Sequence, residues 1–270
     1  MELNCVDIEY KSQSDKFYVV PIGDIHLGNI GCDKHRLKKL VEWISAKDNC
    51  YWIGMGDYID AINISDKRFD AETVDPKYDI KDLGSIVTHQ RNDIMKILLP
   101  IKDKCIGLHR GNHEEKIRKR YHTDIVYEMC ESWKIPELRD AAITRLRFIM
   151  PNGHSNTFDL LSFHGNIGGR RGGNKVNRIE DILGYFDVDI CLMAHAHKKV
   201  TTTLTKAYMS RKEPYSLMTK KCIGGVTGSF LGGYQTSQQS YIETGMYPPS
   251  DLGTLKVTIR PFDKDLHISS

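Results

Sequence analysis

The stretch Phe17-Tyr18-Val19-Val20-Pro21-Ile22-Gly23-Asp24-Ile25-His26 decides the fold. Its first six residues are an apolar, β-prone run, and Gly23 closes the run directly before two polar residues, Asp24 and His26. Such a pattern predicts a buried strand whose carboxyl end carries an aspartate and a histidine.

Four more segments of the chain repeat this arrangement of a β-prone run followed by metal-binding residue types. They are Asp57 and Asp60 after 50–53, Asn112 and His113 after 104–108, His164 after 158–163, and His195 and His197 after 188–193. Strand ends along one edge of an α/β sheet are where such folds collect their ligands. We therefore expect the five segments to converge.

The regions between and after these runs predict an α/β fold. Helical periodicity appears over roughly 35–47, over 83–101 and over 117–133. The second half is rich in predicted strands, with a hairpin of 143–150 and 157–163 and later strands at 200–204, 222–226 and 255–259. An alternating βα half followed by a β-rich half predicts two packed sheets with helices outside.

Length and composition predict one domain over 1–270, because 270 residues with 40% hydrophobic content can bury a large core. The polar connection 61–82 is long, so we expect a lid or rim there. Met1–Tyr10 is unlike a signal peptide, and no apolar run approaches membrane-spanning length. We therefore expect no membrane partner, and the seven scattered cysteines suggest a reduced, cytoplasmic protein.

The residue types define a metal chemistry. Carboxylates, a carboxamide and imidazoles without thiolates suit Mn²⁺, Fe, Zn²⁺ or Ni²⁺. Two metals about 3.5–4 Å apart share a bridging ligand, and Asp57 is the natural bridge because a carboxylate has two oxygens. His113, beside the metals, is expected to protonate the leaving oxygen as general acid, and Asp60 is expected to orient it.

The motifs GD-x-H, GD-x-x-D, GNHE, HG and A-H-x-H, over residues 23–197, resemble those of the calcineurin-like metallophosphoesterase superfamily, whose last motif is usually G-H-x-H. The resemblance implies an αββα sandwich of two mixed β-sheets flanked by helices. It implies that Asp24, His26, Asp57 and His197 hold one metal, and that Asp57, Asn112, His164 and His195 hold the other. It also implies that His113 is catalytic.

One departure refines the expected activity. Protein Ser/Thr phosphatases of this superfamily have an arginine where this chain has Ala61, and they lack the paired histidines. We therefore expect a metal-dependent phosphoesterase that prefers phosphodiesters and uses two divalent ions, Mn²⁺ foremost. The alternatives are a DNA or RNA nuclease with the same two-metal chemistry and a non-catalytic interaction module. The module is disfavoured because every ligand position is filled.

Two basic segments are candidates for binding the phosphates of a nucleotide or nucleic-acid substrate. The Gly/Arg-rich loop expected over 165–178 carries Arg170, Arg171, Lys175 and Arg178. The second segment carries Lys116, Arg118, Lys119 and Arg120. The competing interpretation is a surface loop and an ordinary solvated helix face. Net charge of +3 does not by itself imply nucleic acid.

Overall fold

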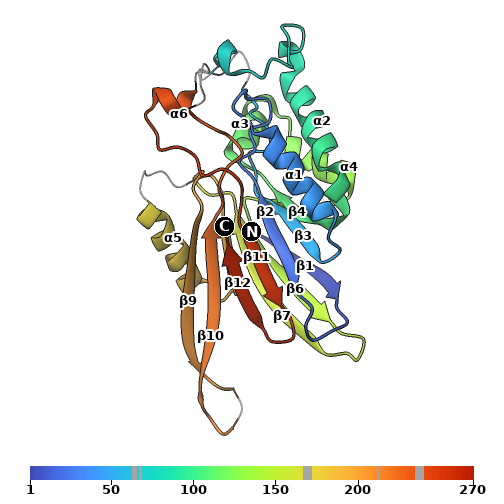
Figure 1. The fold of residues 1–270 in the computed structure, drawn as a ribbon, viewed down its shortest axis with the longest axis vertical. Helices are drawn as coiled ribbons and strands as arrows, with labels where there is room; N and C mark the ends of the chain where they lie inside the picture. Colours follow the sequence, from blue (N-terminus) through green and yellow to red (C-terminus); the bar gives the residue numbers. More distant parts are fainter. Residues whose placement is uncertain (63–65, 67–68, 167–171, 212, 235–239) are drawn as a thin grey trace.

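Two mixed, six-stranded sheets pack face to face in the computed structural model, which describes residues 1–62, 66, 69–166, 172–211, 213–234 and 240–270 (Figure 1). The first sheet has the order β12-β11-β2-β3-β4-β5. Its strands are β2 (Phe17–Ile22), β3 (Cys50–Gly54), β4 (Cys105–His109), β5 (Glu137–Arg139), β11 (Lys256–Arg260) and β12 (Asp265–Ser269). The four strands from β2 to β5 are parallel, and β11 and β12 are antiparallel.

The second sheet has the order β1-β6-β7-β8-β10-β9. Its strands are β1 (Glu2–Glu9), β6 (Ala141–Ile149), β7 (Ser155–Phe163), β8 (Ile190–Met193), β9 (Val200–Met209) and β10 (Leu217–Val226). Between the sheets lies a core built from alternate residues of both, including Val19, Ile53, Leu160 and Ile223. Alternation puts these side chains on one face of each strand, so the two sheets bury a common apolar layer.

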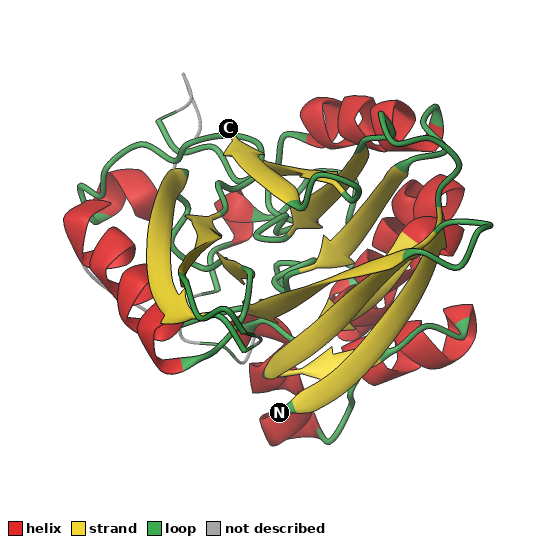
Figure 2. Ribbon diagram, turned by 90° about the horizontal axis from the view of Figure 1, so that it is seen from below, coloured by secondary structure: helices red, strands yellow, loops and turns green. Residues whose placement is uncertain are grey.

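Helices cover the outer faces of both sheets (Figure 2). The first sheet carries α1 (Lys34–Ser45), α2 (Ile86–Leu98), α3 (Asn112–Tyr121) and α4 (Ile125–Trp133), and the second carries α5 (Gly172–Tyr185). In α1, Leu37, Val41 and Ile44 face the core. The layers are therefore helix, sheet, sheet, helix, as the resemblance implied.

The shorter elements are α6 (Tyr241–Thr244) and the 3-10 helices η1 (Ala71–Thr73), η2 (Leu83–Ser85) and η3 (Leu99–Lys104). The connection 61–82 hydrogen-bonds to the loop after β2, since Ile30 donates to the Thr73 carbonyl and Asp75 donates to the Gly28 carbonyl, both at 2.9 Å. Its action as a lid stays a prediction.

Two expectations about helices were wrong. The third predicted helix is two helices, because His122 adopts a left-handed conformation (φ 54°) and Asp124 caps α4 by accepting a hydrogen bond from the Tyr127 N–H. The loop expected over 165–178 is helical from Gly172 onward, because Ile179, Ile182 and Leu183 bury one face of α5 against the second sheet. Strands β1, β5 and β12 were not foreseen.

No helix in the described part of the chain combines the length and the apolar character needed to cross a membrane.

Candidate metal centre

The seven predicted metal ligands come together from both sheets. Asp24, His26, Asp57 and Asn112 follow the ends of β2, β3 and β4 in the first sheet, and His164, His195 and His197 follow β7 and β8 in the second. The carboxyl ends of neighbouring parallel strands meet at one edge of a sheet, which explains why these ligands converge.

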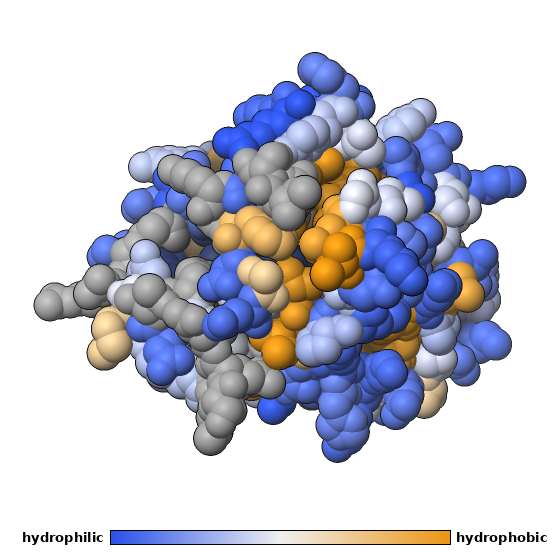
Figure 3. All heavy atoms as spheres, turned by 90° about the horizontal axis from the view of Figure 1, so that it is seen from above, coloured by the Kyte–Doolittle hydropathy of each residue, from blue (hydrophilic) through white to orange (hydrophobic). Residues whose placement is uncertain are grey.

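Figure 3 views the molecule from the upper end of Figure 1 and shows apolar surface surrounded by hydrophilic surface.

One cluster consists of Asp24, His26 and His197, whose ligand atoms all lie within 4.8 Å of one another. The Nε2 atoms of the two histidines are 3.2 Å apart. His197 Nε2 also lies 3.5 Å from Asp24 Oδ1.

A second cluster consists of Asp57, His164 and His195, again with ligand atoms within 4.8 Å. His164 Nε2 lies 3.3 Å from Asp57 Oδ2 and 3.3 Å from His195 Nδ1. Asn112 joins this group, because its Oδ1 lies 3.1 Å from His164 Nε2.

Asp57 connects the two clusters. Its Oδ2 atom lies 3.3 Å from His164 Nε2 in one cluster and 3.9 Å from His26 Nε2 in the other. Its Oδ1 atom accepts a hydrogen bond from the His113 backbone N–H at 2.9 Å. The carboxylate is thus held through one oxygen while the other faces both groups of histidines.

The donor set fits divalent metal ions. Asp24 Oδ1 is buried and has no hydrogen-bond partner within the described residues, while Asp24 Oδ2 accepts the His195 N–H at 2.8 Å. A buried carboxylate oxygen without a partner is costly, and a cation would satisfy it. Imidazole and carboxylate ligands without sulfur suit Mn²⁺, Fe, Zn²⁺ or Ni²⁺.

Charge pairing within the clusters shifts several pKa values. Burial alone raises the pKa of Asp57, but the adjacent His164 and His113 lower it well below its usual range. Burial lowers the pKa of His164, yet the Asp57 carboxylate outweighs this and raises it to about 10. Burial lowers the pKa of His26.

Most of these ligands sit in strained backbone. The φ angles are 49° for Asp24, 52° for His26, 52° for Asp57, 69° for His195 and 51° for His197. Left-handed φ is uncommon for residues with a side chain and costs about 1–3 kcal/mol. Such strain persists only where surrounding contacts enforce it, and it concentrates at functional sites.

Hydrogen bonds to neighbouring groups orient the ligand side chains. His164 Nδ1 donates to the Met55 carbonyl at 2.8 Å, which leaves Nε2 for the cluster. The nearby buried His109 donates from Nδ1 to the Arg139 carbonyl at 3.0 Å and accepts the Ser162 hydroxyl at Nε2, 2.7 Å away. His109 therefore ties the first sheet to the second just behind the cluster.

Glu114 has a role that the sequence reasoning missed. Its buried carboxylate accepts four backbone N–H groups, from Gly111 (3.0 Å), Asp57 (3.0 Å), Tyr58 (2.7 Å) and Ile59 (3.2 Å). Glu114 stands three residues after Gly111, which precedes α3, and this spacing is the capping-box signal that could have revealed the contact. The carboxylate fixes the turn that carries Asp57.

His113 and Asp60 lie beside the first cluster. The His113 ring is 4.6 Å from the His26 ring, between centroids. His113 Nδ1 donates to the backbone carbonyl of Asp60, whereas the Asp60 carboxylate lies 4.0 Å from that nitrogen and 3.7 Å from His26 Nδ1. The direct contact thus uses the main chain of Asp60.

The predicted phosphate-binding residues are only partly placed. Arg170 and Arg171 lie outside the described residues. Arg178 is exposed on α5, but Lys175 is buried at 3% exposure, so it does not present its ammonium group on an open loop as expected. Burial occurs because Lys175 belongs to the face of α5 that packs on the second sheet.

Three of the four cations on the basic face of α3 have ion-pair partners. Lys116 pairs with Asp66 at 2.8 Å, and Glu115 pairs with Arg118 at 2.8 Å and Lys119 at 3.1 Å. These ion pairs favour the interpretation of this segment as an ordinary helix face.

Two tyrosines near the site, Tyr58 and Tyr78, pack inside the protein. Tyr58 is fully buried and its hydroxyl donates to the His109 carbonyl at 2.9 Å. Tyr78 is 8% exposed and donates to Asp93 Oδ2 at 3.0 Å. Neither ring is available to stack on a base.

Comparison with known families agrees with this site. The model of the calcineurin-like phosphoesterase family matches residues 17–199, more than half of the chain, so the protein belongs to that family. Membership and the clustered histidines and aspartates together support a metal-dependent hydrolase of phosphoesters. No curated protein matches the sequence.

Several solved structures align over most of the chain at low identity. A predicted phosphoesterase from Streptococcus pneumoniae is 11% identical, with 94% of each chain covered and a TM-score of 0.37. Vps29 in complex with Zn²⁺ from Entamoeba histolytica is 12% identical, covering 94% of this chain and 97% of its own, with a TM-score of 0.38. The calcineurin-like phosphoesterase YfkN from Bacillus subtilis is 12% identical, covering 83% and 93%, with a TM-score of 0.38.

Proposed function

We propose that this protein hydrolyses phosphodiester bonds with a dinuclear metal centre, loaded foremost with Mn²⁺. The observation that carries the proposal is the position of Asp57 Oδ2, which lies 3.3 Å from His164 Nε2 and 3.9 Å from His26 Nε2. One carboxylate between two sets of imidazoles is the arrangement that a bridged metal pair requires.

The proposed ligands divide into two sets that share Asp57. One metal would be held by Asp24, His26, Asp57 and His197, and the other by Asp57, Asn112, His164 and His195. When bound, such a pair supplies Lewis acidity at the phosphoryl group and a hydroxide-like nucleophile at neutral pH.

His113 is the proposed general acid. Its Nδ1 donates to the Asp60 carbonyl, which fixes the ring, and Nε2 is the atom that would pass a proton to the leaving oxygen. His113 is 8% exposed, so solvent reaches the ring only through a small opening. In this proposal Asp60 positions His113, and its main-chain oxygen does so directly.

A diester is the preferred substrate because this chain has Ala61 at the position where protein Ser/Thr phosphatases have an arginine. Ala61 is 4% exposed, and its N–H donates to Gln90 Oε1 at 3.0 Å. An alanine offers no charge for the additional negative oxygen of a phosphomonoester, which an arginine would bind in bidentate fashion.

The proposal is tested by assaying the Mn²⁺-loaded protein against a bis-aryl phosphodiester, an aryl monophosphate and single-stranded DNA. We expect the diester to be hydrolysed faster than the monoester, and His113→Ala to abolish most of the activity. A protein that hydrolyses none of the three, or a His113→Ala variant as fast as the wild type, contradicts the mechanism. Cleavage of DNA alone would favour the nuclease alternative.

A further inference from the structure

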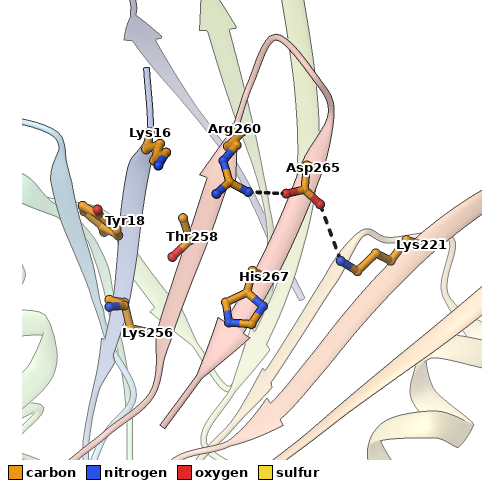
Figure 4. Close-up of a pocket in the computed structure, with 8 residues that line it drawn as sticks. All are labelled: Lys16, Tyr18, Lys221, Lys256, Thr258, Arg260, Asp265 and His267. Carbon is orange, nitrogen blue, oxygen red and sulfur yellow. Dashed lines mark hydrogen bonds and ion pairs between the residues drawn. The ribbon is translucent and has the colours of Figure 1, made fainter. Parts of the chain in front are cut away.

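A basic hollow of about 420 Å³ lies on the outer face of the first sheet (Figure 4). Strands β2, β11 and β12 form it, and β10 contributes Lys221. Its side chains alternate along β11 and β12 with residues such as Val257 and Leu266 that face the inter-sheet core, so the hollow is on the opposite face. The hollow lies beside α1, whose Trp43 packs against Tyr18 of β2.

The hollow carries a strong positive charge. Lys16, Lys221, Lys256 and Arg260 line it together with a single carboxylate, that of Asp265. This surplus of three positive charges is as large as the net charge of the whole chain. Asp265 pairs with Arg260 at 2.6 Å and with Lys221 at 3.5 Å. Lys16 and Lys256 have no carboxylate partner among the described residues.

The cations form a row. Lys256 and Arg260 are four residues apart on β11, so their side chains share one face and start about 13 Å apart. Lys16 precedes β2, the neighbour of β11 in the sheet. Groups spread along a strand in this way match a chain of phosphates better than one compact phosphate.

Aromatic rings continue the row onto α1. The rings of Tyr18 and Trp43 are 5.8 Å apart, and Lys256 Nζ lies 5.5 Å from the first centroid and 6.0 Å from the second. Lys47 Nζ lies 5.1 Å from the Trp43 centroid. Cations that follow a backbone, interleaved with aromatic rings for bases, are the combination used to bind single strands.

We propose that this hollow, with the adjoining rings of Tyr18 and Trp43, binds single-stranded nucleic acid. The phosphates lie along Lys16, Lys256 and Arg260, and a base stacks on the exposed part of the aromatic pair. Tyr18 lies about 13 Å before Ile22, the last residue of β2, and Asp24 comes two residues later, so this surface is separate from the metal centre. Binding there requires no metal.

The test is fluorescence anisotropy of a labelled oligonucleotide of about 12 nucleotides, in EDTA, between 50 and 200 mM salt. Three phosphate contacts predict a slope of about −2 in log K against log salt, or roughly 18-fold weaker binding over this range. Lys16→Ala/Lys256→Ala should bind at least about tenfold more weakly at the low salt concentration, with a slope of about −0.7, since two of the three contacts are lost.

The matched control is Lys38→Ala/Lys96→Ala, which removes two exposed lysines from α1 and α2 and should bind like the wild type. Melting temperatures establish that both variants fold. Absence of binding by the wild type, or unchanged binding by Lys16→Ala/Lys256→Ala, overturns the proposal. So does equal competition by a nucleoside monophosphate or by phosphatidylserine vesicles, because these indicate a small-anion or lipid site.

Hydrolysis of the bis-aryl diester by the same variants separates this proposal from the proposed function. Lys16 and Lys256 lie away from the metal centre, so the rate should not change. Normal hydrolysis without strand binding rejects only the hollow, and strand binding without hydrolysis rejects only the enzyme.

Discussion

The replacement Glu114→Gln tests how the turn that carries the bridging aspartate is held. The Glu114 carboxylate accepts N–H groups at both oxygens, Gly111 and Asp57 at Oε2, and Tyr58 and Ile59 at Oε1. Glutamine has nearly the same shape but only one acceptor oxygen. Two buried N–H groups would therefore face an NH₂ group that cannot accept them.

The expected loss follows from these contacts. Each buried donor left without a partner costs about 1–3 kcal/mol, so Glu114→Gln should lower the free energy of unfolding by about 2–6 kcal/mol. Displacement of the Asp57 turn should also weaken metal binding by about 10–100-fold, as is typical when a group that supports a ligand is changed. Urea denaturation of the metal-free protein measures the first effect, and Mn²⁺ titration calorimetry measures the second.

Glu115→Gln is the matched control, since it makes the same chemical change one residue away. Glu115 is partly exposed and pairs with the surface residues Arg118 and Lys119, and such pairs contribute about 0–1 kcal/mol. It also lies 3.3 Å from Arg110, which would keep Asp124 and Glu137 as partners in this variant. The reasoning is refuted if the free energy of unfolding of Glu114→Gln is within about 1 kcal/mol of that of the control and both variants bind Mn²⁺ equally tightly. The turn would then not be held by the Glu114 carboxylate.

Three further changes test the site and its surroundings. His113→Ala should lower kcat by about 10²–10⁴-fold, because the ring transfers a proton. The metal content should not change, since His113 is not among the proposed ligands. Loss of metal in this variant would contradict that role. Asp57→Ala should lose both metals and His197→Ala only one, because Asp57 is proposed to bind both ions. Inductively coupled plasma mass spectrometry after dialysis measures the metal content. Equal losses in the two variants would exclude Asp57 as a bridge. Burial lowers the pKa of His109 from 6.5 to about 4, so the unfolded chain takes up a proton below about 6.5 that the folded protein takes up only near 4. Stability is therefore lost as the pH falls through this window. Between pH 7 and pH 4, the free energy of unfolding measured in urea should fall by about 3 kcal/mol more for the wild type than for His109→Gln. An equal dependence of this free energy on pH in both proteins would argue against a buried neutral His109.

The sequence by itself determined the fold class and the identity of the clustered residues. Apolar runs such as 17–22 and 188–193 are readable because a buried strand needs continuous apolar character, and the polar residues after them mark the strand ends. Periodicity also located α1 and α2. The same periodicity predicted one continuous helix in place of α3 and α4, because their buried residues continue one helical pattern. Only the turn at the left-handed His122 separates the two helices.

Tertiary structure alone decided which atoms meet. The Glu114 carboxylate reaches N–H groups more than fifty residues away in the chain, and Asp57 Oδ2 faces histidines that belong to different sheets. Lys175 is buried because it lies on the face of α5 that packs on the second sheet. The basic residues beside it in the sequence had suggested an exposed side chain. The basic hollow has the same origin, since β2 is distant in sequence from β10, β11 and β12 and becomes their neighbour only when the sheets form. Residue types can be read from local patterns, whereas distances between atoms depend on long-range pairing and packing that no local pattern encodes.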